Sequence, residues 1–192
     1  CFSVHPLKNL NACGDGGFFV TNNLEFFKKA KKLRNHGLED RNIVKNYGYI
    51  SRMDVVQSCI LNYRLKTLKD TITKRRKNAA FYLKNLNRDF YKIVEEKEYE
   101  FNTYHTFVVQ TSKRNELIKF LKKRGIGTAI HYPIPIHLQP ASKFLNYKKG
   151  DFPVAEKQSK RILTIPIHQN LKQRELENVV WLMNKFASDN KE

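Results

Sequence analysis

The sequence predicts an α/β protein in which a long helix joins two unequal parts. Short apolar runs that are typical of strands alternate with segments whose apolar residues recur at helical spacing. One helical pattern covers residues 54–86, and a helix of that length in a globular chain often links two bodies. We therefore divide the chain into residues 1–53, a linking helix over 54–86 and a small α/β domain over 87–192.

Two short strands are expected at the start of the chain. The first covers residues 1–5 and ends at Pro6, which has no N–H to donate to a ladder. The run Gly14-Asp15-Gly16-Gly17 predicts a tight turn, and residues 18–21 predict the second strand.

A helix should follow the second strand. Asn22 or Asn23 can cap it, Gly37 ends it, and helical spacing relates its apolar residues Leu24, Phe27, Ala30 and Leu33. Two strands and one helix cannot bury their apolar faces alone, so residues 1–53 predict the edge of a larger domain. Because the chain also lacks an initial methionine, we expect it to be the C-terminal part of a longer protein.

The remaining elements are predicted from the same two periods. The pattern over 54–86 begins at Asp54, a suitable N-cap, and places on one face Val56, Ile60, Tyr63, Leu68, Ile72, Ala79 and Leu83. Strands are expected over 106–109, 128–130 and 164–167, and helices over 115–124, 153–162 and 173–186. The last helix should bury Leu176, Val179, Val180, Met183 and Phe186.

Composition excludes several protein classes. A hydrophobic fraction of 41% with 13 phenylalanines is too high for a disordered chain. No apolar run approaches the roughly 20 residues that a membrane-spanning helix needs. The three cysteines are odd in number and lack metal-ligand spacing, which predicts a reducing cytoplasm with neither a disulfide framework nor a metal site.

The net charge of +18 makes an anionic partner plausible. The basic residues are spread along the chain, and the densest runs, residues 28–32 and 74–77, lie inside helical patterns whose charges usually face solvent. No nucleic-acid motif accompanies the charge. A basic nucleic-acid-binding protein is therefore an alternative, and no specific nucleic-acid partner is expected.

Among residues 1–53, Lys8 is the strongest candidate for a chemical role. It leaves a strand through a proline and enters a glycine-rich turn, where a rigid scaffold can present a functional group. Ser3 lies five residues earlier with a hydroxyl that could reach a phosphate, and no acidic residue lies within six positions of Lys8. If desolvated, such an amine could act as a nucleophile; otherwise it is a solvated surface cation.

The segment "CFSVHPLKNLNACGDGGFFVTN" resembles the lysine segment of the DegT/DnrJ/EryC1/StrS family of pyridoxal-phosphate-dependent nucleotide-sugar aminotransferases. The resemblance continues in the order of the family through "KKLRNHG", "GYISRMDVVQSCIL", "GIGTAIHYPIPIHLQP" and "GDFPVAEKQSKRILTIPI". It covers nearly the whole chain. The lysine segment and the segment with two Pro-Ile pairs are its specific parts.

This resemblance implies an aspartate-aminotransferase type of fold, with a large α/β domain before a small one, in a homodimer that shares its active sites. It implies that Lys8 carries pyridoxal 5'-phosphate as an internal aldimine and that Ser3 contacts the cofactor phosphate. The implied reaction moves an amino group from glutamate or glutamine to a keto-sugar on a nucleoside diphosphate, for surface polysaccharide or deoxyaminosugar synthesis.

The loop before the long helix departs from the family pattern. The family usually has "G-Y-N-x-R", whose asparagine reaches the partner subunit's cofactor phosphate, whereas this chain has Gly48-Tyr49-Ile50-Ser51-Arg52. Because the side chain of Ile50 has no hydrogen-bond donor, Ser51 or a backbone N–H would have to replace that contact. Tyr49 and Arg52 match the pattern and are candidates for the shared site, with a surface or loop-anchoring role as the alternative for Arg52.

Further candidates lie in the later segments. His131 and Tyr132 fall where family members meet the sugar nucleotide, with a hydrogen-bonded structural role as the alternative for His131. His137 is a weaker candidate. Asn35 and His36 are expected to cap or brace the end of a helix.

The family's remaining cofactor groups precede the lysine segment. They are the carboxylate on the pyridinium nitrogen, the residue stacked on the ring and a helix N-terminus at the phosphate. Because the chain begins a few residues before Lys8, we expect activity from the parent protein and none from this chain alone. A cofactor-free regulatory member of the family is a further alternative, although such members usually lack the lysine.

Overall fold

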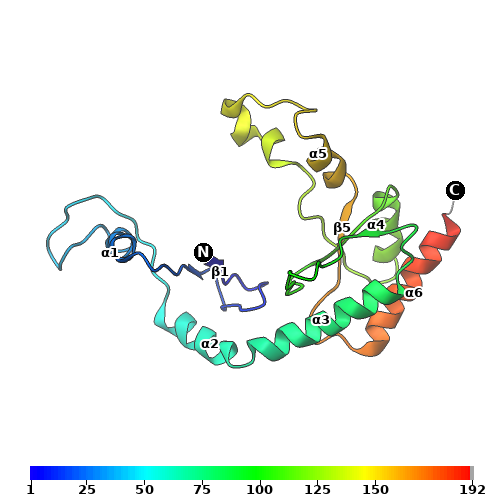
Figure 1. Cartoon of the computed structure of the whole chain (residues 1–192), viewed down its shortest axis with the longest axis horizontal. Helices are drawn as coiled ribbons and strands as arrows, with labels where there is room; N and C mark the ends of the chain where they lie inside the picture. The colour runs from blue at the N-terminus through cyan, green and yellow to red at the C-terminus, as the bar shows by residue number, and fades with distance from the viewer. Residues whose placement is uncertain (191–192) are drawn as a thin grey trace. The chain divides into compact units, whose positions relative to one another are not determined.

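The computed structural model describes residues 1–190, and the chain divides into two compact units, one over Cys1–Asp70 and one from Thr71 onward. None of the helices within residues 1–190 is both long and apolar enough to cross a membrane. Figure 1 gives the order of the elements along the chain.

The first unit begins with a small hairpin. Strands β1 (Phe2–Ser3) and β2 (Gly17–Phe18) pair antiparallel, with Phe2 opposite Phe18. The two phenyl rings stack with centroids 4.9 Å apart, and both side chains remain exposed. Below the hairpin, Val4, Ala12 and Leu61 form a small buried cluster, so the interior of this unit is thin.

Helix α1 (Leu24–Leu33) confirms the helix predicted after the second strand. Its N-cap is Asn23, whose side-chain oxygen accepts a hydrogen bond from the N–H of Phe26 at 2.9 Å. The apolar face that the spacing predicts buries no residue, and Leu24 and Phe27 are 62% and 50% exposed. An apolar face is therefore present, but the described residues do not cover it.

The helix predicted over residues 54–86 is two helices, α2 (Val55–Leu65) and α3 (Leu68–Asn85). Between them, the N–H of Lys66 donates to the carbonyl of Tyr63, and the N–H of Thr67 donates to the carbonyl of Arg64. The Thr67 hydroxyl donates to the Arg64 carbonyl as well, at 3.2 Å. A threonine hydroxyl that competes for a helix carbonyl is a local cause of such a break, and apolar spacing does not reveal it.

The second unit is built on an antiparallel sheet of three strands in the order β3-β4-β5. The strands are β3 (Lys92–Ile93), β4 (Phe107–Gln110) and β5 (Ile162–Ile165), with Phe107 opposite Ile165. Helices α3, α4 (Arg114–Lys122) and α6 (Gln173–Asp189) gather around this sheet (Figure 1). The expected strand over 128–130 is a single bridge between Ala129 and Thr164, and β3 was not expected.

The core of the second unit lies between the sheet and these helices. The residues predicted to face inward from α6 are all buried: Leu176, Val179, Val180, Met183 and Phe186. They pack with apolar residues of the sheet and of α3 and α4, including Tyr82, Val109, Leu117, Leu121 and Leu163. After α4, the chain forms two 3-10 helices, η1 (Ile136–Leu138) and η2 (Pro140–Leu145), before α5 (Pro153–Ser159).

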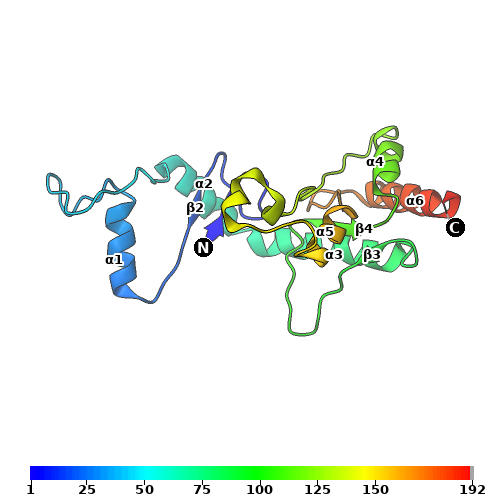
Figure 2. The same ribbon diagram turned by 90° about the horizontal axis from the view of Figure 1, so that it is seen from above.

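Two successive arginines of α3 fix the loops of the second unit. Arg75 is 7% exposed and donates only to neutral oxygens: the carbonyls of Tyr104, His105 and Ile167, and the side chain of Gln169. Arg76 contacts the long loop between β3 and β4, and this loop extends away from the sheet in Figure 2.

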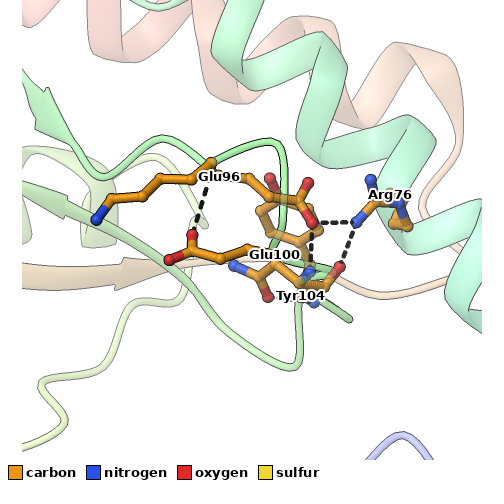
Figure 3. Close-up of polar contacts among 6 residues, drawn as sticks. Arg76, Glu96, Glu100 and Tyr104 are labelled. Atoms are coloured by element: carbon orange, nitrogen blue, oxygen red, sulfur yellow. Dashed lines mark hydrogen bonds and ion pairs between the residues drawn. The ribbon is translucent and has the colours of Figure 1, made fainter.

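Figure 3 shows how Arg76 holds this loop. The guanidinium lies 2.8 Å from the Glu96 carboxylate and donates to the carbonyl of Asn102 at 2.7 Å. The same Glu96 oxygen accepts a hydrogen bond from the N–H of Asn102, and the guanidinium lies over the Phe101 ring, 4.3 Å from its centroid. These contacts lower the pKa of Glu96, chiefly through the Arg76 hydrogen bond.

Candidate functional site

Lys8 lies in the loop between β1 and β2, and the backbone closes that loop tightly. Val4 is 1% exposed; its N–H donates to the carbonyl of Gly16 at 3.0 Å, and its carbonyl accepts from the N–H of Ala12 at 2.8 Å. Inside this closure, the N–H of Lys8 donates to the carbonyl of His5 at 2.8 Å. The loop therefore presents the Lys8 amine from a fixed backbone.

Side chains of helix α2 form hydrogen bonds with the backbone of the same loop. Arg64 donates to the carbonyl of Asn11 at 2.7 Å, and the side-chain oxygen of Gln57 accepts from the N–H of Cys13 at 2.8 Å. Neither Arg64 nor Gln57 was predicted from the sequence. Each is separated from its partner by more than 40 positions, so no local pattern could have found them.

The environment of Lys8 suits an amine with a chemical task. Its side chain is half-buried, and it forms no ion pair with any carboxylate of residues 1–190. Ser3 in β1 is exposed, and its hydroxyl accepts only a long contact from the N–H of His5 at 3.4 Å. The hairpin thus offers one amine and one hydroxyl that structural contacts leave largely available.

Tyr49 and Arg52 belong to a segment that is fastened to the end of α1. The N–H of Tyr49 donates to the carbonyl of Leu33 at 2.7 Å, and the N–H of Ser51 donates to the carbonyl of Arg34 at 2.9 Å. Because the Ser51 N–H is used in this way, it cannot replace the amide that Ile50 lacks. The phenol of Tyr49 and the guanidinium of Arg52 remain exposed.

The segment Asn35-His36-Gly37 braces the end of α1 through its backbone, as predicted. The N–H groups of Asn35 and Gly37 both donate to the carbonyl of Lys32, and the N–H of His36 donates to the carbonyl of Tyr49. Gly37 has φ 74°, in the left-handed region that favours glycine. A Cβ at this position would meet the carbonyl oxygen of Asn46, so the residue is also required for close packing.

His131 and Tyr132 lie in the second unit and line an apolar cavity of about 650 Å³. The His131 Nδ1 lies 2.9 Å from the Thr164 hydroxyl. This contact agrees with the hydrogen-bonded structural role that was the alternative for His131. Tyr132 is 71% exposed. The cavity is also lined by aromatic side chains, among them Tyr147 and Phe152.

His137 is buried and paired at the edge of this cavity. Its Nε2 lies 3.1 Å from the Glu156 carboxylate, which also accepts a hydrogen bond from the Gly150 N–H at 2.7 Å. The Gly150 N–H, followed by His137, lowers the pKa of Glu156. These contacts connect η1, the loop before α5, and α5 itself.

The sequence candidates thus fall into three places: Ser3 and Lys8 on the hairpin, Tyr49 and Arg52 beside α1, and His131 and Tyr132 in the second unit. Within residues 1–190, no group of three or more His, Cys, Asp or Glu side chains could hold a metal ion. A primary amine and a hydroxyl presented by one hairpin suit an aldehyde cofactor with a phosphate group.

Comparisons with known proteins support this interpretation. The chain is 37% identical over 188 residues to a Geobacillus stearothermophilus protein named "Pleiotropic regulatory protein", covering 96% of this chain and 50% of that protein. It is 33% identical over 187 residues to dTDP-3-amino-3,4,6-trideoxy-alpha-D-glucose transaminase of Streptomyces venezuelae, covering 97% of this chain and 49% of that enzyme. The chain spans about half the length of the curated relatives it matches.

Solved structures share the fold. DesV of S. venezuelae, solved in complex with a ketimine intermediate, matches with a TM-score of 0.93 at 33% identity, over 97% of this chain and 50% of that one. A Brucella abortus aminotransferase of the same family matches with a TM-score of 0.89 at 29% identity, over 96% of this chain and 49% of that one. The α/β fold class predicted from the sequence is confirmed. Since the model of the DegT/DnrJ/EryC1/StrS aminotransferase family matches residues 1–184, the chain belongs to that family.

Proposed function

We propose that this chain is the lysine-bearing part of a pyridoxal-phosphate-dependent sugar aminotransferase. The observation that carries the proposal is Lys8, a half-buried amine that forms no ion pair within residues 1–190 and sits on a loop closed by backbone hydrogen bonds. The neutral form of a lysine amine is the nucleophile that attacks a carbonyl.

The donor set on the hairpin fits pyridoxal phosphate. Lys8 would hold the aldehyde carbon, and the Ser3 hydroxyl would donate to the phosphate. When bound, the cofactor supplies an electron-accepting ring for chemistry at the amino-bearing carbon. Once the amine of the amino donor has displaced the Lys8 amine from the aldehyde carbon, the Nζ of Lys8 would be free to take the proton from the amino-bearing carbon and to return it, as general base and acid. Arg64 and Gln57 position Lys8 by holding its loop on α2.

The substrate class is proposed from the relatives. Among these are transaminases named for dTDP-linked and UDP-linked amino sugars. By extension, this protein would aminate a keto-sugar on a nucleoside diphosphate in the cytoplasm, with glutamate or glutamine as donor, for surface polysaccharide or deoxyaminosugar synthesis. It would act as a homodimer with shared sites, where Tyr49, Arg52, His131 and Tyr132 are candidate contacts.

The test uses a polypeptide that contains this chain at the length of its relatives. Formation of 2-oxoglutarate from glutamate is followed with UDP- and dTDP-linked 3-keto-sugars as acceptors. We expect Lys8→Ala to lower the rate by about 10²–10⁴-fold, the usual contribution of a positioned acid-base group. Lys69→Ala, at an exposed lysine of α3, is the control. An unchanged rate in Lys8→Ala would contradict the proposal.

A regulatory function is the second candidate, because the relative at 37% identity is named as a pleiotropic regulatory protein. Lys8 argues against a role without the cofactor. If the same polypeptide releases no 2-oxoglutarate with any sugar nucleotide and does not bind pyridoxal phosphate, this second function is favoured.

A further inference from the structure

The apolar cavity of about 650 Å³ in the second unit has walls from three parts of the chain. Val108 of β4 and Ile162 of β5 belong to the sheet. The segment over residues 131–139, which we call the strap, forms the second wall. The third wall consists of the loop before α5 and of α5 itself, and includes Tyr147 and Phe152. Figure 1 shows how the chain leaves the sheet after α4 and returns to β5 through α5.

The strap is held at its start by the sheet. His131 Nδ1 lies 2.9 Å from the Thr164 hydroxyl of β5. Pro133 and Pro135 then lack an N–H, and their rings restrict the backbone that follows. A stiff span of this kind takes its position from its two ends, so the contact at His137 matters as much as the contact at His131.

The contact between His137 and Glu156 joins the strap to the third wall. Both residues are buried, and His137 Nε2 lies 3.1 Å from the carboxylate oxygen that also accepts the Gly150 N–H. The Gly150 hydrogen bond, followed by that of His137, lowers the pKa of Glu156. The carboxylate is therefore ionised at neutral pH and can only accept, so His137 Nε2 donates to it. The His137 ring also packs against Phe152, with ring centroids 4.7 Å apart.

The strap carries exposed side chains into the lining of the cavity. Tyr132, Ile134 and Ile136 lie between its two ends, and each of them lines the cavity. If the end at His137 were released, these side chains would no longer keep one position relative to α5. The apparent affinity for a ligand that needs one arrangement of the walls falls with the fraction of molecules that hold this arrangement.

We propose that the contact between His137 and Glu156 fixes the strap against α5 and thereby places Tyr132 for the sugar nucleotide, so that both act as positioning residues. This inference rests on the proposed function, in which Tyr132 is a candidate contact. It gives His137 a role other than direct contact with the substrate, because its Nε2 is already used by Glu156.

The test measures the KM and kcat of a polypeptide that contains this chain at the length of its relatives. Formation of 2-oxoglutarate from saturating glutamate is followed with the better of the UDP- and dTDP-linked 3-keto-sugars. His137→Leu keeps an apolar side chain beside Phe152 and removes the donor to Glu156. We expect it to raise the KM for the sugar nucleotide about tenfold and to leave kcat within about twofold, because a hydrogen bond to a charged group is lost.

This split between KM and kcat separates positioning from simple damage to the fold. A variant that only lowers the fraction of folded enzyme loses rate at saturating substrate and keeps its KM. His168→Leu is the control: it changes an exposed histidine of the same unit whose Nδ1 accepts the Asn170 N–H at 3.2 Å. His168 is outside the lining of the cavity within residues 1–190, so its KM should stay within about twofold of wild type.

Two further variants test whether His137 acts through Glu156. His137→Gln puts an amide N–H where the ring Nε2 donates, so its KM should stay within about threefold of wild type. The double variant His137→Leu/Glu156→Gln should raise KM no further than His137→Leu alone, because both changes affect one contact.

The outcomes distinguish this inference from the proposed function. Active enzyme with the wild-type KM in His137→Leu, or with equally raised KM in His137→Leu and His137→Gln, would overturn this inference alone. If circular dichroism shows that His137→Leu does not fold, Glu156→Gln takes its place with an expected rise in KM of about threefold, and an unchanged KM would overturn the inference. A wild-type polypeptide that transaminates no sugar nucleotide would overturn the proposed function and this inference with it.

Discussion

Arg75→Met tests whether a buried guanidinium holds the second unit together. The side chain is 7% exposed and is surrounded by oxygens that carry no formal charge. Two of its hydrogen bonds are buried, each 3.0 Å long, to the carbonyls of Tyr104 and Ile167. Arg75 therefore joins α3 to the loop that precedes β4 and to the segment that follows β5.

The expected cost follows from the groups that methionine would leave behind. The carbonyls of Tyr104 and Ile167 would each lose a buried partner, at about 1–3 kcal/mol apiece. Relief of the guanidinium desolvation, which also lowers the pKa of Arg75, offsets part of this. We predict that Arg75→Met lowers the free energy of unfolding by about 2–4 kcal/mol.

The chain provides its own reporter and control for this measurement. Trp181 is the single tryptophan and lies in α6, so its fluorescence in a urea titration reports on the second unit. Lys74→Met removes the same charge from the neighbouring, exposed position of α3 and should stay within about 0.5 kcal/mol of wild type. Equal stability of the two variants would refute the proposed role of Arg75.

Three other predictions concern the same unit. Leu163→Ala, at a fully buried position of β5, should cost about 2–5 kcal/mol in urea unfolding, and a loss below 1 kcal/mol would contradict the assigned core. Glu96→Gln should speed hydrogen exchange in the loop over residues 94–106, whereas Glu98→Gln should not; equal exchange in both would show that the Glu96 contacts do not order the loop. The Gly150 N–H lowers the pKa of Glu156, so the contribution of the Glu156 carboxylate to stability is complete above about pH 4.5 and is lost as pH falls below that value. Glu156→Gln should therefore lower the melting temperature more at pH 7 than at pH 3. An equal effect at both pH values would exclude the ionised carboxylate as the cause.

The sequence predicted well the features that depend on local periodicity. The inward face of α6 and the cap at Asn23 follow from side-chain spacing and from one side-chain oxygen, and both were confirmed. The break between α2 and α3 was missed because it depends on competition for the Arg64 carbonyl, which leaves the apolar pattern intact.

Contacts between distant positions could not be predicted. Arg64 reaches the Lys8 loop across more than 50 positions, and Arg75 reaches Gln169 across more than 90. A charge run on a helix usually indicates a solvated face, so the burial of Arg75 could not be predicted from its position within residues 74–77. Lys8 was found because its proline and glycine neighbours mark a local turn, and its role there stays a prediction.

The central claim is that Lys8 is the residue that holds pyridoxal phosphate. A polypeptide containing this chain at the length of its relatives is incubated with the cofactor, reduced with borohydride and digested with trypsin. The masses of the peptides are then measured by mass spectrometry. A modified lysine resists trypsin, so we predict one equivalent of cofactor on a peptide that continues past Lys8 to Lys28, and none in Lys8→Arg. One equivalent on another lysine, or undiminished labelling of Lys8→Arg, would contradict the claim.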